Sequence, residues 1–104
     1  MKAVNKHLQE KLRDPYFREL YELEAQKLGI VKKIIAYRLF HKLSQSALAK
    51  HAGVTQQHIS KIENGEFSNI ITLEKVLLLI GFKIRLNAVR LSQEERKLVA
   101  TGTS

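Results

Sequence analysis

The sequence predicts a mainly α-helical protein, and three observations point to that fold class. Pro occurs once and Gly five times in 104 residues, so helix-breaking residues are rare. Apolar residues recur at helical spacing over long stretches, with charged residues on the other faces. In the middle of the chain, capping residues and Gly bound several short segments, as they do in short helices joined by tight turns. The length fits one domain with short extensions.

The composition excludes disulfide-stabilised and membrane-spanning proteins. The chain has no Cys, and its longest apolar stretch is too short to span a bilayer. Since the N-terminus has no apolar secretory segment behind it, we expect a cytoplasmic protein with no membrane partner. The hydrophobic fraction of 44% allows a modest core that is marginal alone and that a dimer partner would help. The net charge of +8 favours nucleic acid as a partner over an inert basic surface.

Residues 1–28 are predicted to form an N-terminal helical extension. A short first helix precedes Asp14-Pro15, which is a helix start signal because Asp can cap and Pro suits the first helical position. Apolar side chains then follow at helical spacing: Phe17, Leu20 and Tyr21. Gly29 is expected to break this helix or to form a turn between two helices.

Residues 29–81 are predicted to form the main domain. An amphipathic helix covers residues 30–40, and a membrane-surface helix is the alternative interpretation of its pattern. Three short helices follow, each with a capping residue before it and a Gly at its end. The first covers residues 45–52 between Ser44 and Gly53, and the second covers residues 56–64 between Thr55 and Gly65. The third is capped by Thr72 and ends near Gly81.

Residues 82–91 are predicted to form a dimerisation strand, because apolar and polar residues alternate from 82 to 88. A lone strand cannot satisfy its own backbone groups, so a twin strand from a second copy is the simplest partner. Pairing within the chain, or a helix mistaken for a strand, is the alternative. The predicted dimerisation residues are Phe82, Ile84 and Leu86. Residues 92–104 are predicted to form a tail. Ser92 and Glu95 have capping-box spacing, which predicts a short helix over residues 93–99 with Ser92 as its N-cap.

The two short helices on either side of Gly53 have the pattern of a helix-turn-helix unit. Ala49 lies where the two helices approach closely, so a small side chain is needed there. Gly53 lies at the turn, where a β-carbon would be strained if φ is positive. Apolar residues fill the wedge between the helices: Leu48, Val54, Ile59 and Ile62. The whole pattern at the correct spacing is a specific signal.

The second helix of this unit has a polar face suited to DNA bases. Ile59 and Ile62 define its buried face, and the opposite side carries the following residues, with Gln56 at its margin: Gln57, Ser60, Lys61 and Asn64. Gln can pair with adenine N6 and N7, and Lys can reach guanine O6 or N7. We interpret this face as a DNA-reading surface; the alternative is an ordinary solvated face.

Residues 43–50 and 54–65 resemble the lambdoid phage repressor and Cro family, the xenobiotic-response-element type of helix-turn-helix. The resemblance implies a five-helix lambda-repressor-like domain, in which Gln56 and Gln57 contact bases and Gln45 contacts phosphate. It also implies a structural ion pair between Arg38 and Glu63. The full set of expected DNA-binding residues is Ser44, Gln45, Thr55, Gln56, Gln57, Ser60, Lys61 and Asn64. Two departures from the family pattern are Ala47, where Glu is common, and residues 66–69, which lack basic side chains.

Residues 12–22 and 79–86 are similar to the host-inhibition-of-growth antitoxins of type II toxin–antitoxin modules. This similarity implies that the N-terminal helices bind a toxin, a messenger-RNA-cleaving nuclease, through Tyr16, Phe17 and Tyr21. It also implies that a homodimer represses its own operon at a pseudopalindromic operator in double-stranded DNA. The alternatives are a stand-alone phage-like or metabolic transcriptional regulator without a toxin, and a protein-interaction adaptor that keeps the fold and has lost DNA binding.

An enzyme is not expected from this sequence. The four His residues lack metal-ligand spacing supported by acids or Cys. The Gly residues form no phosphate-binding signature, and no nucleophile–base pair can be singled out. We therefore expect no catalytic residue, no metal site and no cofactor.

Overall fold

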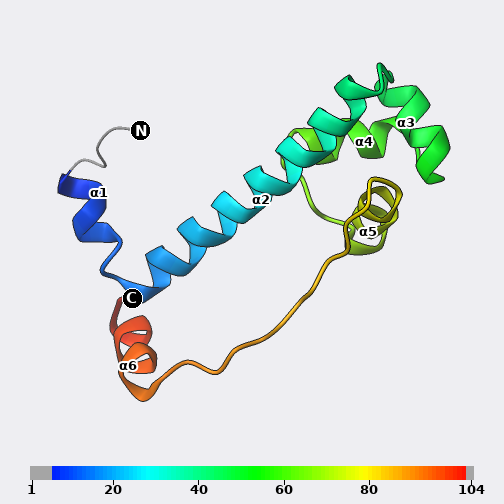
Figure 1. Cartoon of the computed structure of the whole chain (residues 1–104). Helices are drawn as coiled ribbons and strands as arrows, with labels where there is room; N and C mark the ends of the chain where they lie inside the picture. Colours follow the sequence, from blue (N-terminus) through cyan, green and yellow to red (C-terminus); the bar gives the residue numbers. More distant parts are fainter. Residues whose placement is uncertain (1–5, 103–104) are drawn as a thin grey trace. The chain divides into compact units, whose positions relative to one another are not determined.

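The computed structural model describes residues 6–102, and it contains six helices and no strand over that range (Figure 1). In chain order the helices are α1 (Lys6–Lys11), α2 (Pro15–Phe40), α3 (Gln45–Ala52), α4 (Gln56–Glu63), α5 (Ile70–Leu79) and α6 (Gln93–Gly102). The chain divides into two compact units. One spans Lys27–Leu86, and the other joins the described residues up to Gln26 with those from Asn87 on. The prediction of a mainly α-helical protein is confirmed.

The predicted break at Gly29 is wrong, because α2 is one uninterrupted helix of 26 residues. Gly inside a helix costs about 1 kcal/mol relative to Ala, which is too little to end a helix whose neighbouring residues are well packed. Val31 and Ile34, on the next turn, are buried, and their burial offsets the cost. Helical spacing therefore continues through Gly29.

The predicted caps of α3 and α4 are confirmed. The Ser44 hydroxyl accepts the N–H of Ala47 at 3.0 Å, and Gly53 ends α3 with φ at 74°. The Thr55 hydroxyl accepts the N–H of His58 at 3.1 Å. In return the Thr55 N–H donates to His58 Nδ1 at 3.4 Å, so a His completes a capping box where Glu or Gln is usual. These caps define both ends of the turn between α3 and α4.

α5 begins earlier than predicted. Its N-cap is Asn69, whose side chain accepts the N–H of Thr72 at 3.1 Å. Thr72 lies inside the helix and is buried, so it is not the cap. The predicted end near Gly81 is confirmed, since Ile80 is the C-cap and Gly81 has φ of 97°. Asn and Thr are both capping residues, and local spacing alone does not choose between them.

The core of the Lys27–Leu86 unit lies where the second half of α2 meets α3, α4 and α5 (Figure 1). Its buried residues are Ile34, Leu48, Ala49, Ile59, Ile62, Leu73, Val76 and Leu77. Each fully buried Leu, Ile or Val stabilises the fold by about 1.5–3 kcal/mol. The predicted wedge between the two short helices is part of this core, and Val54 packs against it from the turn.

The strand predicted over residues 82–91 does not form in the structure of the single chain. Residues 82–92 have no regular secondary structure, and the described residues offer no second strand to pair with. A strand needs a neighbour for its N–H and C=O groups, and an alternating pattern cannot supply one. Two hydrogen bonds connect the start of this segment to α5: the Phe82 N–H donates to the Leu77 carbonyl at 2.8 Å, and the Ile84 N–H donates to Glu74 Oε1 at 2.9 Å.

The other unit contains α1, the first part of α2, and α6. The Asp14-Pro15 start signal is confirmed, because α2 begins at Pro15 and the Asp14 carboxylate accepts the N–H of Tyr16 at 3.0 Å. The capping box of α6 is also confirmed, with Ser92 and Glu95 exchanging two hydrogen bonds of 3.0 Å. α6 continues beyond the predicted residue 99. Over residues 6–102, no helix is long and apolar enough to cross a membrane.

Candidate nucleic-acid interface

α3 and α4 pack closely because the residues between them are either small or fully buried apolar side chains. Ala49 is buried on α3, and Leu48 and Ile59 are completely enclosed. The turn is tight, since Gly53 adopts a left-handed conformation and the Val54 N–H returns to the Ala49 carbonyl at 3.0 Å. A β-carbon at this φ is strained, so Gly53 suits the turn. This arrangement leaves the first turn of α4 exposed.

An ion pair joins the end of α2 to the end of α4. Arg38 Nε donates to Glu63 Oε2 at 2.8 Å, and Arg38 Nη2 donates to Glu63 Oε1 at 3.1 Å. A third donor, Nη1, binds the Leu43 carbonyl at 3.1 Å in the loop before α3. The Glu63 side chain is only 7% exposed, and its hydrogen bond raises the pKa of the Arg38 guanidinium. Two-bond Arg–carboxylate pairs of this kind are strong and geometrically specific.

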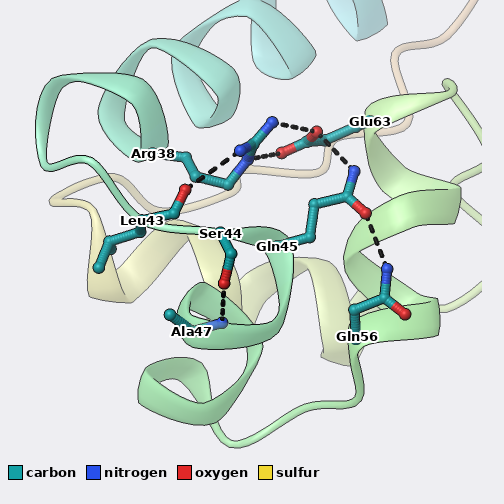
Figure 2. A network of polar contacts seen from close by, with 7 residues as sticks. All are labelled: Arg38, Leu43, Ser44, Gln45, Ala47, Gln56 and Glu63. Carbon is teal, nitrogen blue, oxygen red and sulfur yellow. Dashed lines mark hydrogen bonds and ion pairs between the residues drawn. The ribbon is translucent and has the colours of Figure 1, made fainter.

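Two amides extend this ion pair toward the exposed start of α4 (Figure 2). Gln45 Nε2 donates to Glu63 Oε1 at 3.0 Å. Gln56 Nε2 then donates to Gln45 Oε1 at 2.8 Å. The network therefore links α2, α3 and α4, and it brings together two of the predicted DNA-binding residues. The family resemblance implies a phosphate contact for Gln45, and it indicated neither of these two hydrogen bonds.

The other predicted DNA-binding residues lie on or beside α3 and α4. Gln57, Lys61 and Asn64 are exposed along α4, while Ser60 is half-buried. Ser44 and Thr55 are exposed at the two N-termini, where their hydroxyls serve as caps. The first turns of both helices contain no acidic residue. Their N-terminal N–H groups and dipoles are therefore not compensated by a carboxylate, which favours an anion nearby.

The residues predicted to bind a toxin lie at the start of α2, in the other unit. Tyr16 and Tyr21 are exposed, and Phe17 is half-buried with its ring 6.2 Å from that of Tyr21. The Lys11 ammonium lies 5.6 Å from the centre of the Phe17 ring. Within residues 6–102, no group of His, Asp or Glu could hold a metal ion.

The loop after α4 is held by a contact that the sequence did not indicate. Phe67 packs against the core, and the Lys27 ammonium lies 5.4 Å from the centre of its ring. An ammonium over an aromatic face is attracted by about 0.5–1 kcal/mol at an exposed site. The loop that lacks the basic residues of the family pattern is thus anchored to α2.

Comparison with known families agrees with this geometry. Residues 34–82 match a family described as helix-turn-helix, and the match covers the end of α2 together with α3, α4 and α5. No curated protein and no solved structure matches the chain. The match over residues 34–82 supports a helix-turn-helix domain of the xenobiotic-response-element type, a kind of domain that DNA-binding transcription regulators contain.

Proposed function

We propose that the chain is a sequence-specific transcriptional repressor that reads the major groove of DNA with α4. The observation that carries this proposal is the exposed first turn of α4, where Gln56 and Gln57 are consecutive and Gln56 is oriented by hydrogen bonds that lead back to the partly buried Glu63. Gln pairs with adenine through N6 and N7, so the two residues read adenine-bearing base pairs. Such helices contact base edges with their N-terminal residues.

Residues around this turn bind the phosphate backbone. Gln45 keeps one amide N–H beyond the one that it donates to Glu63, and its backbone N–H belongs to the first turn of α3. Ser44 and Thr55 lie at the two helix N-termini, which attract anions. Lys61 and Asn64, further along α4, add a charged and a polar group that reach phosphate or a base edge. The phosphate contacts among these position α4 and carry little sequence information.

A second copy of the chain completes the DNA-binding unit. An open apolar groove of about 500 Å³ lies between α5 and the segment that follows it, with Ile71, Leu78 and Leu86 among its lining residues. Glu74 and Lys75 also line it, so two copies related by a two-fold axis can pair opposite charges across it. We place Phe82, Ile84 and Leu86 in this interface. Two α4 helices then contact half-sites about 34–36 Å apart.

The unit that contains the start of α2 suits a protein partner, and we propose a toxin that cleaves messenger RNA. Tyr16, Leu20 and Leu23 are each 46–53% exposed, and they repeat at intervals of one helical turn. With Phe17 and Tyr21 they give this part of α2 an exposed apolar surface, which typically marks an interaction site. The chain is then the antitoxin of a type II module. Co-expression with the product of the adjacent gene tests this: the chain should relieve growth arrest, and Tyr16→Ser with Leu20→Ser should not.

The proposed DNA-reading function is tested by selecting binding sites from random duplex DNA at several salt concentrations. The wild type should enrich a palindromic, adenine-bearing site, and its affinity should fall steeply with salt because phosphate contacts release counterions. Gln56→Ala with Gln57→Ala should lose the enrichment while salt-sensitive binding remains. Weak, salt-sensitive binding of the wild type without an enriched site would contradict sequence-specific repression and would favour an adaptor.

A further inference from the structure

The network in Figure 2 has a direction, because Glu63 can hydrogen-bond its neighbours in only one sense. An ionised carboxylate accepts and never donates. Both of its oxygens accept N–H groups from Arg38, at 2.8 and 3.1 Å. Gln45 approaches Glu63 Oε1 to 3.0 Å, so it must turn its Nε2 toward the carboxylate and its Oε1 away from it.

The orientation of Gln45 decides the orientation of Gln56. Gln45 Oε1 is an acceptor, and Gln56 Nε2 donates to it at 2.8 Å. An amide side chain has two N–H groups and one oxygen, so Gln56 keeps its Oε1 and one N–H for a partner outside the protein. Gln56 is exposed, whereas Gln45 is half-buried and the Glu63 side chain nearly buried. The direction of the exposed Gln56 amide is thus determined by Glu63, which lies further inside the domain.

We infer that Glu63, acting through Gln45, makes Gln56 select adenine over guanine. Adenine presents the N6 donor beside the N7 acceptor in the major groove, which matches the free oxygen and N–H of Gln56. Guanine presents two acceptors, O6 and N7. The Gln56 oxygen is also an acceptor, so it cannot form a hydrogen bond with the guanine atom that it faces. Glu63 and Gln45 are therefore positioning residues that determine specificity without touching a base. This inference rests on the proposed DNA-reading function.

Two variants at position 45 test the direction of the network while leaving the Arg38–Glu63 pair in place. Gln45→Lys substitutes an ammonium, which only donates. It can donate to Glu63 and to Gln56 Oε1, which turns the Gln56 N–H groups toward the base and favours guanine. Gln45→Met has similar length and no N–H group, so it leaves Gln56 free to adopt either orientation. Thermal unfolding establishes that each full-length variant is folded.

The experiment first selects a site with the wild type and identifies the base pair whose preference Gln56→Ala erases. Kd is then measured for duplexes with adenine or guanine at that position. The ratio of the guanine Kd to the adenine Kd should be about 5- to 150-fold in the wild type. It should approach one in Gln45→Met and fall below one in Gln45→Lys, with preferences at other base pairs unchanged.

Three results would overturn the inference, and they differ in what else they contradict. An unchanged ratio in both position-45 variants would show that Gln56 selects adenine without help from Glu63. A wild-type site in which Gln56→Ala erases no preference would show that Gln56 is not a base-reading residue, while sequence-specific binding stands. Failure of the wild type to enrich any site would contradict the proposed function itself, and the inference with it.

Discussion

Arg38 and Glu63 form a two-bond ion pair between the end of α2 and the end of α4, with N···O distances of 2.8 and 3.1 Å. Their side chains are 17% and 7% exposed, so water screens this pair less than it screens a surface pair. Removing one partner of such a pair leaves the other charge poorly solvated. The pair also fixes the position of Gln45, since Glu63 Oε1 accepts from both Arg38 and Gln45.

Arg38→Met is expected to lower the free energy of unfolding by about 2–4 kcal/mol, because it leaves the Glu63 carboxylate without its cation. Adding Glu63→Leu removes the unpaired charge, so the double variant should be more stable than Arg38→Met alone. Urea denaturation of the wild type, Arg38→Met, Glu63→Leu and the double variant measures these differences. A double variant that loses the sum of the two single effects would show that the residues contribute independently.

Gly53→Ala and Gly29→Ala are expected to change stability in opposite directions. Gly53 has φ of 74°, where an L side chain is strained, so Gly53→Ala should cost about 1–2 kcal/mol. Gly29 lies inside α2, and apart from its chain neighbours and the backbone of the same helix, no heavy atom lies within 4 Å of the position of an added β-carbon. Gly29→Ala should therefore raise the free energy of unfolding by up to about 1 kcal/mol.

Thermal and urea unfolding of the two Gly variants give the measurement. Each variant controls for the other, since both add the same methyl group to a Gly of the same domain. Destabilisation by Gly29→Ala would contradict a continuous helix at that point. An unchanged stability in Gly53→Ala would contradict the left-handed turn between α3 and α4.

Capping signals predicted this fold well because they act over three or four residues. Ser44, Gly53 and Thr55 stand next to the groups that they cap, so the bounds of α3 and α4 could be predicted from the sequence. The continuity of α2 through Gly29 could not be predicted, because the effect of a Gly inside a helix depends on how much apolar surface the neighbouring residues bury. Whether residues 82–91 form a strand could not be predicted either, because a strand needs a neighbouring strand and the alternating pattern does not indicate one.

The side-chain contacts of the candidate interface could be predicted only in part. Sequence resemblance implied an ion pair of Arg38 with Glu63, and the structure contains it. The contacts of Gln45 with Glu63 and Gln56 depend on the angle at which α3 crosses α4, which no local pattern encodes. A helical wheel of α4 assigns Gln56 to the margin of the polar face, but it gives no direction to its amide. The direction in which the Gln56 amide presents its oxygen and its N–H groups therefore follows only from tertiary contacts.

The capping box of α6 is expected to weaken in acid. Hydrogen bonding from the Ser92 backbone N–H, with a smaller contribution from its hydroxyl and from Arg18, lowers the pKa of the Glu95 carboxyl below its usual value. A carboxyl whose pKa is lower in the folded state stabilises that state above its ordinary pKa. The contribution is lost as the pH falls through the lowered pKa. Amide chemical shifts of α6 should therefore move toward coil values at low pH.

Glu95→Gln provides the matched control for this pH dependence. Gln at the same position can still accept the Ser92 N–H, and it does not titrate. The variant should keep its α6 chemical shifts across the acid range in which those of the wild type change. If both proteins lost the α6 signals at the same pH, another group would be responsible.

The proposed contact between two copies at the groove beside α5 predicts that dimerisation and DNA affinity change together. Ile71 and Leu86 line the groove and are each 71% exposed in the single chain, so Ile71→Ser and Leu86→Ser should leave the domain folded. In a symmetric dimer each substitution occurs twice at the interface. The dimer dissociation constant should therefore rise by about tenfold or more. The Ser substitutions leave the net charge unchanged, so attraction to phosphate is preserved.

Leu39→Ser is the control, because Leu39 is 61% exposed on α2 and does not line the groove. Sedimentation equilibrium measures the dimer, and titration measures binding to a full palindrome and to an isolated half-site. Ile71→Ser and Leu86→Ser should weaken binding to the palindrome and leave half-site binding unchanged, because α4 is untouched. Leu39→Ser should change neither. Equal losses on both duplexes would mean that the groove acts on α4 within one chain, and it would exclude the groove as the contact between copies.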